Sequence, residues 1–314
     1  MTVTPTATPE KSAILLLAHG TPDSLDEIPE YLRNVTGGRP LPSSVVAEIR
    51  HRYSLIGASP LTRLTLQQGR DLAAHLGIPV YVGMRNWKPY IADALHAMRA
   101  DGVTRFAAIC LAPQNSRTSV GLYKRAVAAA ADGMRLDFTE GWADHPLLAD
   151  AFAERLRAVY TPGTTAGAES KVLFTAHSVP MRTLQATADS PADPYADEAR
   201  HTASLVASRL NLDPANWFFA FQSQGMSGEP WIGPTVEDTL TALRQRDITR
   251  IILQPIGFLC DHIEILYDID IAFREYASNL GMELVRPESL NHSTLLTAAL
   301  ADLSRKALAR LEAS

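Results

Sequence analysis

Cysteine is scarce in this chain of 314 residues: it occurs only at Cys110 and Cys260, far apart and outside any CxxC or Cys/His cluster. Two cysteines cannot supply an all-cysteine iron–sulfur cluster, and their spacing argues against a structural zinc site. Isolated thiols are typical of proteins in a reducing compartment. We therefore expect a cytoplasmic protein without an iron–sulfur cluster.

Long apolar runs and an excess of charge of one sign are also lacking. No run approaches the roughly 20 apolar residues that span a bilayer, so no transmembrane segment is expected. The 29 Lys and Arg and 34 Asp and Glu give a formal net charge of −5, which provides no basic footprint for nucleic acid. The P-loop, a GxGxxG turn after a strand and the nucleophile elbow are all missing.

Length and composition indicate a globular protein of two domains. Apolar residues make up 46% and charged residues 20%, and each half is long enough to bury its own core. Residues 1–10 carry no positive charge, unlike a signal peptide, and residues 161–170 are rich in Gly, Thr and Ala, like a linker. We expect a disordered tail (1–11), an N-terminal domain (12–165), a C-terminal domain (171–285) and a closing helix that packs back on the body (286–314).

Short β-prone apolar runs alternate with stretches of helical spacing, which indicates βαβ units and a mainly parallel sheet. Strands are expected over residues 14–18, 79–82, 106–111, 136–140, 172–177 and 251–254. Helices are expected over residues 25–35, 42–52, 61–76, 90–100, 122–134, 146–160 and 293–311, and from about Asp261 onward.

The second half repeats the first. ILLLAHGTP (14–22) resembles VLFTAHSVP (172–180), and residues 89–105 match 234–250 without a gap. One such match could arise by chance between amphipathic helices, but two in the same order indicate duplication. We therefore expect two α/β domains of the same plan, facing each other across a cleft.

His19 and His177 stand at equivalent positions of this repeat, each at the end of an apolar strand. Ligands of open α/β sheets bind at the carboxyl ends of the strands, so both imidazoles are expected to face the cleft. The alternative is a strand-terminal His that only hydrogen-bonds a loop.

The stretch QPIGFLCDHIEILYDID (254–270) supplies carboxylates. Asp261 and Glu264 have the spacing of a capping box, which would make Glu264 structural. Glu264 and Asp268 are also i,i+4 neighbours on one helix face. Two carboxylates without a basic partner at that spacing cost stability, which points instead to a cation or a proton path.

A Gly/Pro-rich loop follows the apolar residues near 221, and Trp231 lies within it. Its indole either anchors a turn or walls a pocket for a flat ligand. From the residues alone, a His-plus-carboxylate site without Cys suits a divalent metal such as Fe(II), or acid–base chemistry.

These motifs together resemble the ferrochelatase family, and the resemblance extends from about residue 13 to 305. Its carriers are FTAHSVP (174–180), FQSQGMSGEPWIGP (221–234), QPIGFLCDHIEILYDID (254–270), RYSLIGASPL (52–61) and LAP (111–113). The resemblance implies two Rossmann-like domains with parallel four-stranded sheets flanked by helices. It also implies a lyase of heme biosynthesis that inserts Fe(II) into a porphyrin in the cleft and releases two protons. Iron is then a substrate, and no permanently bound cofactor is expected.

The resemblance also implies roles for individual residues. His177 and Glu264 become the catalytic pair and, with Asp268, the metal-handling groups. Porphyrin contacts are expected from four residues: His19, Arg52, Tyr123 and Trp231.

Three positions depart from family patterns. The coproporphyrin III branch typically has Tyr in place of His19 and an Arg in place of Thr36, and parts of the family have an acid in place of Ala272. Protoporphyrin IX and coproporphyrin III therefore both stay open as substrates, as do the role of His19, the iron donor and the oligomeric state. The alternatives are a Co(II) or Ni(II) chelatase of sirohydrochlorin type and a non-catalytic tetrapyrrole or metal carrier.

Overall fold

A computed structural model describes residues 10–160, 170–188, 190–225 and 228–313. Its first sheet is parallel, with the strand order β2-β1-β3-β4. The strands are β1 (Ser12–Ala18), β2 (Val80–Met84), β3 (Arg105–Cys110) and β4 (Arg135–Thr139). Residues 1–9 of the predicted tail and residues 161–169 of the predicted linker lie outside the described residues.

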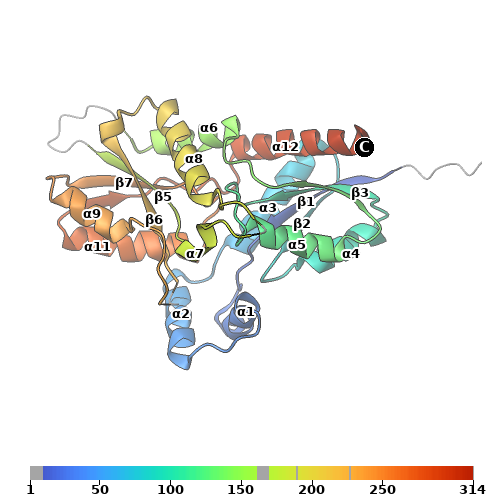
Figure 1. Ribbon diagram of the computed structural model, residues 1–314, viewed down its shortest axis with the longest axis horizontal. Coiled ribbons are helices and arrows are strands. Elements are labelled where there is room, and N and C mark those ends of the chain that lie inside the picture. The colour runs from blue at the N-terminus through green and yellow to red at the C-terminus, as the bar shows by residue number, and fades with distance from the viewer. Residues whose placement is uncertain (1–9, 161–169, 189, 226–227, 314) are drawn as a thin grey trace, which may run out of the picture.

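The second sheet repeats this topology with the order β6-β5-β7-β8, again parallel. Its strands are β5 (Lys171–His177), β6 (Trp217–Gln222), β7 (Arg250–Pro255) and β8 (Glu283–Val285). In each sheet the strand that leads into the repeated Ala-His pair is second in order: β1 lies between β2 and β3, and β5 lies between β6 and β7. The predicted fold, two similar domains with parallel four-stranded sheets flanked by helices, is confirmed (Figure 1).

Helices flank both sheets. Those of the first half are α3 (Leu61–Leu76), α4 (Ile91–Ala100), α5 (Val120–Ala130) and α6 (Pro146–Arg157). Those after β5 include α7 (Met181–Leu184), α8 (Tyr195–Arg209) and α9 (Val236–Arg244). The last helix, α12 (Thr294–Ala313), returns to the first sheet and packs against α3, α6, β3 and β4 (Figure 1).

The largest core cluster contains buried residues of both halves, among them Leu16, Phe152, Phe174 and Leu300. Apolar burial of this kind is the main force that stabilises a fold. Because α6, α8 and α12 contribute to one cluster, the two sheets are held in a fixed relation, and the carboxyl ends of their strands can form one site.

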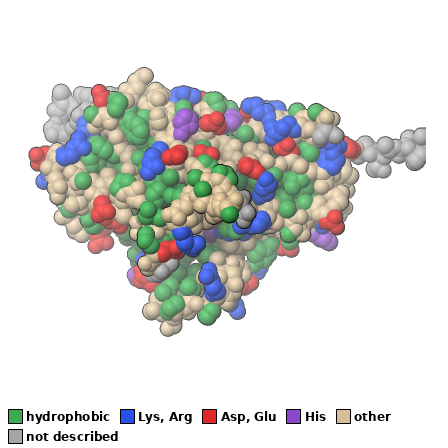
Figure 2. Space-filling model, viewed as in Figure 1, with side chains coloured by type: hydrophobic (Ala, Val, Ile, Leu, Met, Phe, Trp, Pro, Cys, Tyr) green, Lys and Arg blue, Asp and Glu red, His purple; other side chains and the backbone are tan. Residues whose placement is uncertain are grey.

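A separate lobe, made by α1 (Ile28–Val35) and α2 (Ser43–Ile56), projects from the sheets (Figure 1 and Figure 2). It has a small core of its own that includes Tyr31, Tyr53 and Trp87. A 3₁₀ turn, Leu25–Glu27, leads into it. The lobe carries side chains that reach back toward the strand ends.

The prediction of one continuous helix from about Asp261 was wrong. The segment has a short helix α10 (Ile263–Leu266), a π-helix at Asp268–Phe273 and a second short helix α11 (Arg274–Asn279). A π turn holds more residues than an α turn and recurs at functional sites. Here it lets Asp268 contact Ser223 while Asp270 contacts Arg286.

Within the described residues, no helix has both the length and the hydropathy of a membrane span. Figure 2 shows acidic and basic side chains interspersed over the visible face.

Candidate functional site

A cavity of about 350 Å³ lies at the carboxyl ends of strands from both sheets. Ala18 and His177 line it from the last positions of β1 and β5, and Leu111 and Gly257 line it just after β3 and β7. This is the position where open α/β sheets bind ligands. Five of the residues predicted for the site line it: His19, Tyr123, His177, Trp231 and Glu264.

His177 and Glu264 are brought together in this cavity, although they are 87 positions apart in the sequence. Nε2 of His177 lies 3.4 Å from Oε1 of Glu264. On its other side, the imidazole contacts the carbonyl oxygen of Ser178 through Nδ1. The hydroxyl of Tyr195 donates to the carbonyl of His177 at 2.8 Å, which fixes the end of β5.

A buried amide holds the Glu264 segment beside β5. Gln222, 1% exposed, accepts a hydrogen bond from Thr175 of β5 at 2.6 Å and donates to the carbonyl of Glu264 at 2.9 Å. The positions of the imidazole and the carboxylate are therefore coupled through one buried side chain.

The electrostatics of the pair favour the charged forms of both groups. Burial is the largest single influence on His177 and disfavours the imidazolium, but Glu264, the Ser178 carbonyl and Asp268 together raise its pKa to about 9. Burial likewise acts to raise the pKa of Glu264, and His177, His262 and His19 together lower it to about 2. At neutral pH the free site therefore holds an ion pair.

His19 approaches the cavity from the first sheet and is neutral at pH 7, because burial and then the charge of Arg85 lower its pKa to about 4. Tyr31 Oη and Asn86 Nδ2 each lie 3.1 Å from its Nε2. Gly20 follows with a φ of +80°, and a Cβ there would lie 2.8 Å from the backbone nitrogen of Trp87. The turn that presents His19 therefore requires glycine.

His262 is a cavity residue that the sequence reasoning missed. Its Nε2 lies 3.7 Å from Oε2 of Glu264, and its buried Nδ1 has no hydrogen-bond partner in the part of the chain that the structure describes. Burial, the largest influence, lowers its pKa. The only sequence feature that could have predicted His262 as a cavity residue is its position two residues before Glu264. That position does not indicate which way the imidazole points.

The capping-box interpretation of Asp261 and Glu264 is wrong. The residue before α10 is His262 rather than Asp261, and the His262 side chain makes no capping hydrogen bond. Asp261 instead accepts hydrogen bonds from Ser289 at 2.6 Å and from Asn291 at 3.0 Å. Glu264 is thereby left to face the cavity.

Two predicted site residues lie outside the cavity wall. Arg52 pairs with Glu48 at 2.8 Å and stacks over Tyr267 at 5.1 Å. Asp268 accepts a hydrogen bond from Ser223, and burial together with Glu264 raises its pKa to about 6. Across the described ranges, no three His, Cys, Asp or Glu side chains are arranged to hold a metal ion.

Trp231 forms part of the wall, with its ring centre 6.4 Å from that of His177. Its indole lies against Gly225, where a Cβ would be 2.6 Å from Cζ2 of the ring. Glycine at this position therefore sets the depth to which the indole reaches into the wall.

Gly225→Ala is expected to displace Trp231 and to weaken binding of a flat aromatic ligand about fivefold, since one aromatic contact contributes about 1 kcal/mol. Ligand titration followed by indole emission measures this. Gly121→Ala is the control, because a Cβ there meets its nearest atom at an ordinary 3.6 Å. Equal affinities for the two variants would contradict the role given to Gly225.

Comparisons with known proteins agree on one family. A family model described as Ferrochelatase matches residues 11–308. A ferrochelatase of Acidobacterium capsulatum is 64% identical over 317 aligned residues, covering 97% of each chain. A coproporphyrin III ferrochelatase of Geobacillus kaustophilus is 32% identical, covering 94% of this chain and 95% of the relative.

A solved structure shares the fold. The sirohydrochlorin chelatase SirB from Bacillus subtilis subspecies spizizenii, in complex with cobalt, matches with a TM-score of 0.58, covering 97% of this chain and 98% of that one. Because the two are 12% identical, this likeness concerns the arrangement of strands and helices alone.

Proposed function

The chain belongs to the ferrochelatase family, and from this premise we propose how its cavity performs the reaction. The enzyme inserts ferrous iron into a porphyrin in heme synthesis. We propose that the porphyrin lies in the cavity between the two sheets, with His177 and Glu264 handling metal and protons. Iron is then a substrate, and no resident cofactor takes part.

One observation carries this proposal: a paired imidazole and carboxylate, 3.4 Å apart, face a cavity whose opposite side presents a neutral His19. Imidazole and carboxylate are ligands suited to Fe(II). Trp231 and Tyr123 supply aromatic wall, which suits a flat macrocycle.

Insertion requires that two pyrrole N–H protons leave as Fe(II) binds the four ring nitrogens. The approach of Fe(II) opposes the positive charge on His177, so the imidazole loses its proton before its nitrogen can act as ligand or base. Glu264 is ionised before iron arrives, so its charge stabilises the incoming cation.

Asp268 is the residue suited to pass protons outward. Its pKa of about 6 allows it to take up and release a proton near neutrality, whereas Glu264 binds a proton only weakly. We therefore assign the order His177, Glu264, Asp268 to the outward path of the protons.

The experiment incubates the apo-protein anaerobically with Fe(II) and either protoporphyrin IX or coproporphyrin III, and follows the absorption change on metallation. The native protein is expected to metallate at least one porphyrin, and His177→Ala to lower the rate about a hundredfold. His201→Ala, on the exposed face of α8, is the control. Absence of metallation with both porphyrins, or an unchanged rate in His177→Ala, would overturn the proposal.

A further inference from the structure

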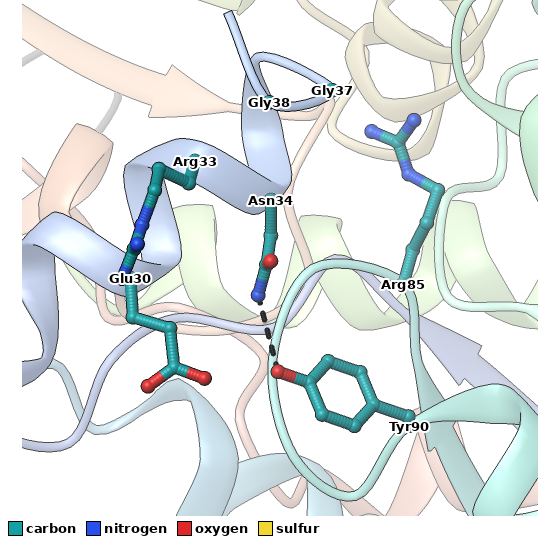
Figure 3. Close-up of a pocket in the computed structure, with 7 residues that line it drawn as sticks. All are labelled: Glu30, Arg33, Asn34, Gly37, Gly38, Arg85 and Tyr90. Atoms are coloured by element: carbon teal, nitrogen blue, oxygen red, sulfur yellow. Dashed lines mark hydrogen bonds between the residues drawn. The ribbon is translucent and has the colours of Figure 1, made fainter. Parts of the chain in front are cut away.

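A second cavity, of about 610 Å³, opens beside the lobe of α1 and α2 (Figure 3). Arg85 lines both this open groove and the porphyrin cavity, so the two spaces meet at its side chain. The groove is lined by Glu30, Arg33, Asn34, Gly37, Gly38, Arg85 and Tyr90.

Within the described residues, the guanidinium of Arg85 has no anionic partner. Its Nε is buried without a hydrogen bond, and no carboxylate of the described residues lies within ion-pair distance of it. Its cation instead stands 5.6 Å from the ring centre of Tyr123. A partly buried cation without a counter-ion is unfavourable, so this arrangement favours an anion that arrives with a ligand.

The backbone holds Arg85 in place at the edge of the first sheet. Its N–H donates to the carbonyl of Ala18 at 3.0 Å, and the next N–H, of Asn86, donates to the carbonyl of His19 at 2.9 Å. The guanidinium therefore starts from the same rigid edge as the imidazole that faces the porphyrin cavity.

The groove leaves room in front of the guanidinium. Figure 3 shows Arg85 facing across the space toward Gly37, whereas Arg33 runs along α1 toward Glu30. Gly37 and Gly38 have φ angles of +62° and +84°, and a Cβ on either would meet no atom within 4 Å. Asn34 donates to the hydroxyl of Tyr90 at 3.1 Å and closes one side.

We propose that Arg85 binds a propionate carboxylate of the porphyrin at the point where the cavity opens into this groove. The inference rests on the proposed function, because it takes the porphyrin as the ligand. A guanidinium binds a carboxylate through two parallel hydrogen bonds, and Tyr123 orients its plane. The groove then takes up the acidic edge of the macrocycle while its centre faces His177.

The test measures equilibrium binding of coproporphyrin III and of its tetramethyl ester, in the same detergent buffer, by porphyrin fluorescence. Arg85→Gln is expected to weaken binding of the free acid about tenfold and to leave binding of the ester unchanged within twofold. Arg85→Lys is expected to recover part of the affinity for the acid, since lysine keeps the positive charge but cannot form the two parallel hydrogen bonds of a guanidinium. Arg246→Gln, which removes an arginine stacked 5.3 Å from Phe218 far from the cavity, is the matched control.

Equal losses for acid and ester in Arg85→Gln, or no loss for the acid, would overturn the inference. If Arg85→Gln does not fold, Arg85→Lys provides the test. An equal change in affinity for acid and ester, or no loss for the acid, would then overturn the inference. Equilibrium binding is measured without iron insertion. A protein that binds the acid through Arg85 but does not insert iron would therefore contradict the proposed function and not this inference.

Discussion

Glu264→Gln is expected to lower the maximum rate of iron insertion about a hundredfold and to move its pH dependence toward acid. In the native site, burial alone would lower the pKa of His177, but Glu264, with the Ser178 carbonyl and Asp268, raises it to about 9. Without the Glu264 charge, the main influence that opposes burial is lost and this pKa falls. The rising limb of the rate, which follows loss of the His177 proton, therefore shifts from near pH 9 toward acid.

The loss of rate is measured at saturating porphyrin and Fe(II). The pH limb is measured as kcat/KM for Fe(II), because that ratio reports the pKa values of the site before iron binds. Glu275→Gln, an exposed carboxylate of α11, controls for the general loss of one negative charge. A limb that stays near pH 9 in Glu264→Gln would mean that this carboxylate does not set the protonation of His177.

The strand ends of the site could be predicted because their signals are local. β1 and β5 are continuous apolar runs, fully buried over most of their length, and each run is followed directly by polar residues at the carboxyl edge. The internal repeat then related His19 to His177, because duplicated domains keep the same strand order. Neither step needs information about residues far away in the sequence.

The features that the sequence did not reveal depend on distant partners. The interruption between α10 and the π-helix reflects contacts of Asp268 with Ser223 and of Asp270 with Arg286, which i,i+4 spacing cannot indicate. The open guanidinium of Arg85 is recognised only when every carboxylate nearby is accounted for. Sequence motifs predicted aromatic and acidic site residues such as Trp231 and Glu264. They could not predict Arg85, because its role depends on having no carboxylate beside it among the described residues.

Arg286 shows how such a distant partner positions the site. Its guanidinium binds Asp270 in bidentate fashion, at 2.7 and 2.8 Å, and lies 3.3 Å from Asp261. These acids flank the segment that carries Glu264, one on each side of α10. A single side chain, 11% exposed, therefore ties both ends of that segment to the loop after β8.

Arg286→Met is expected to destabilise the protein by roughly 3 kcal/mol. It removes the partly buried cation that Asp261 and Asp270 share, and Asp270 keeps only the more exposed Arg274, at 3.6 Å. The midpoint of thermal unfolding measures this.

The matched control is Arg310→Met. Arg310 binds Asp137 with the same bidentate geometry, at 2.7 and 2.8 Å, but its side chain is 56% exposed, so its loss is expected to cost less than about 1 kcal/mol. Adding Asp270→Asn to Arg286→Met is expected to restore part of the stability, since one of the two stranded charges is removed. Equal unfolding midpoints for the two Arg→Met variants would show that burial does not strengthen the Arg286 network.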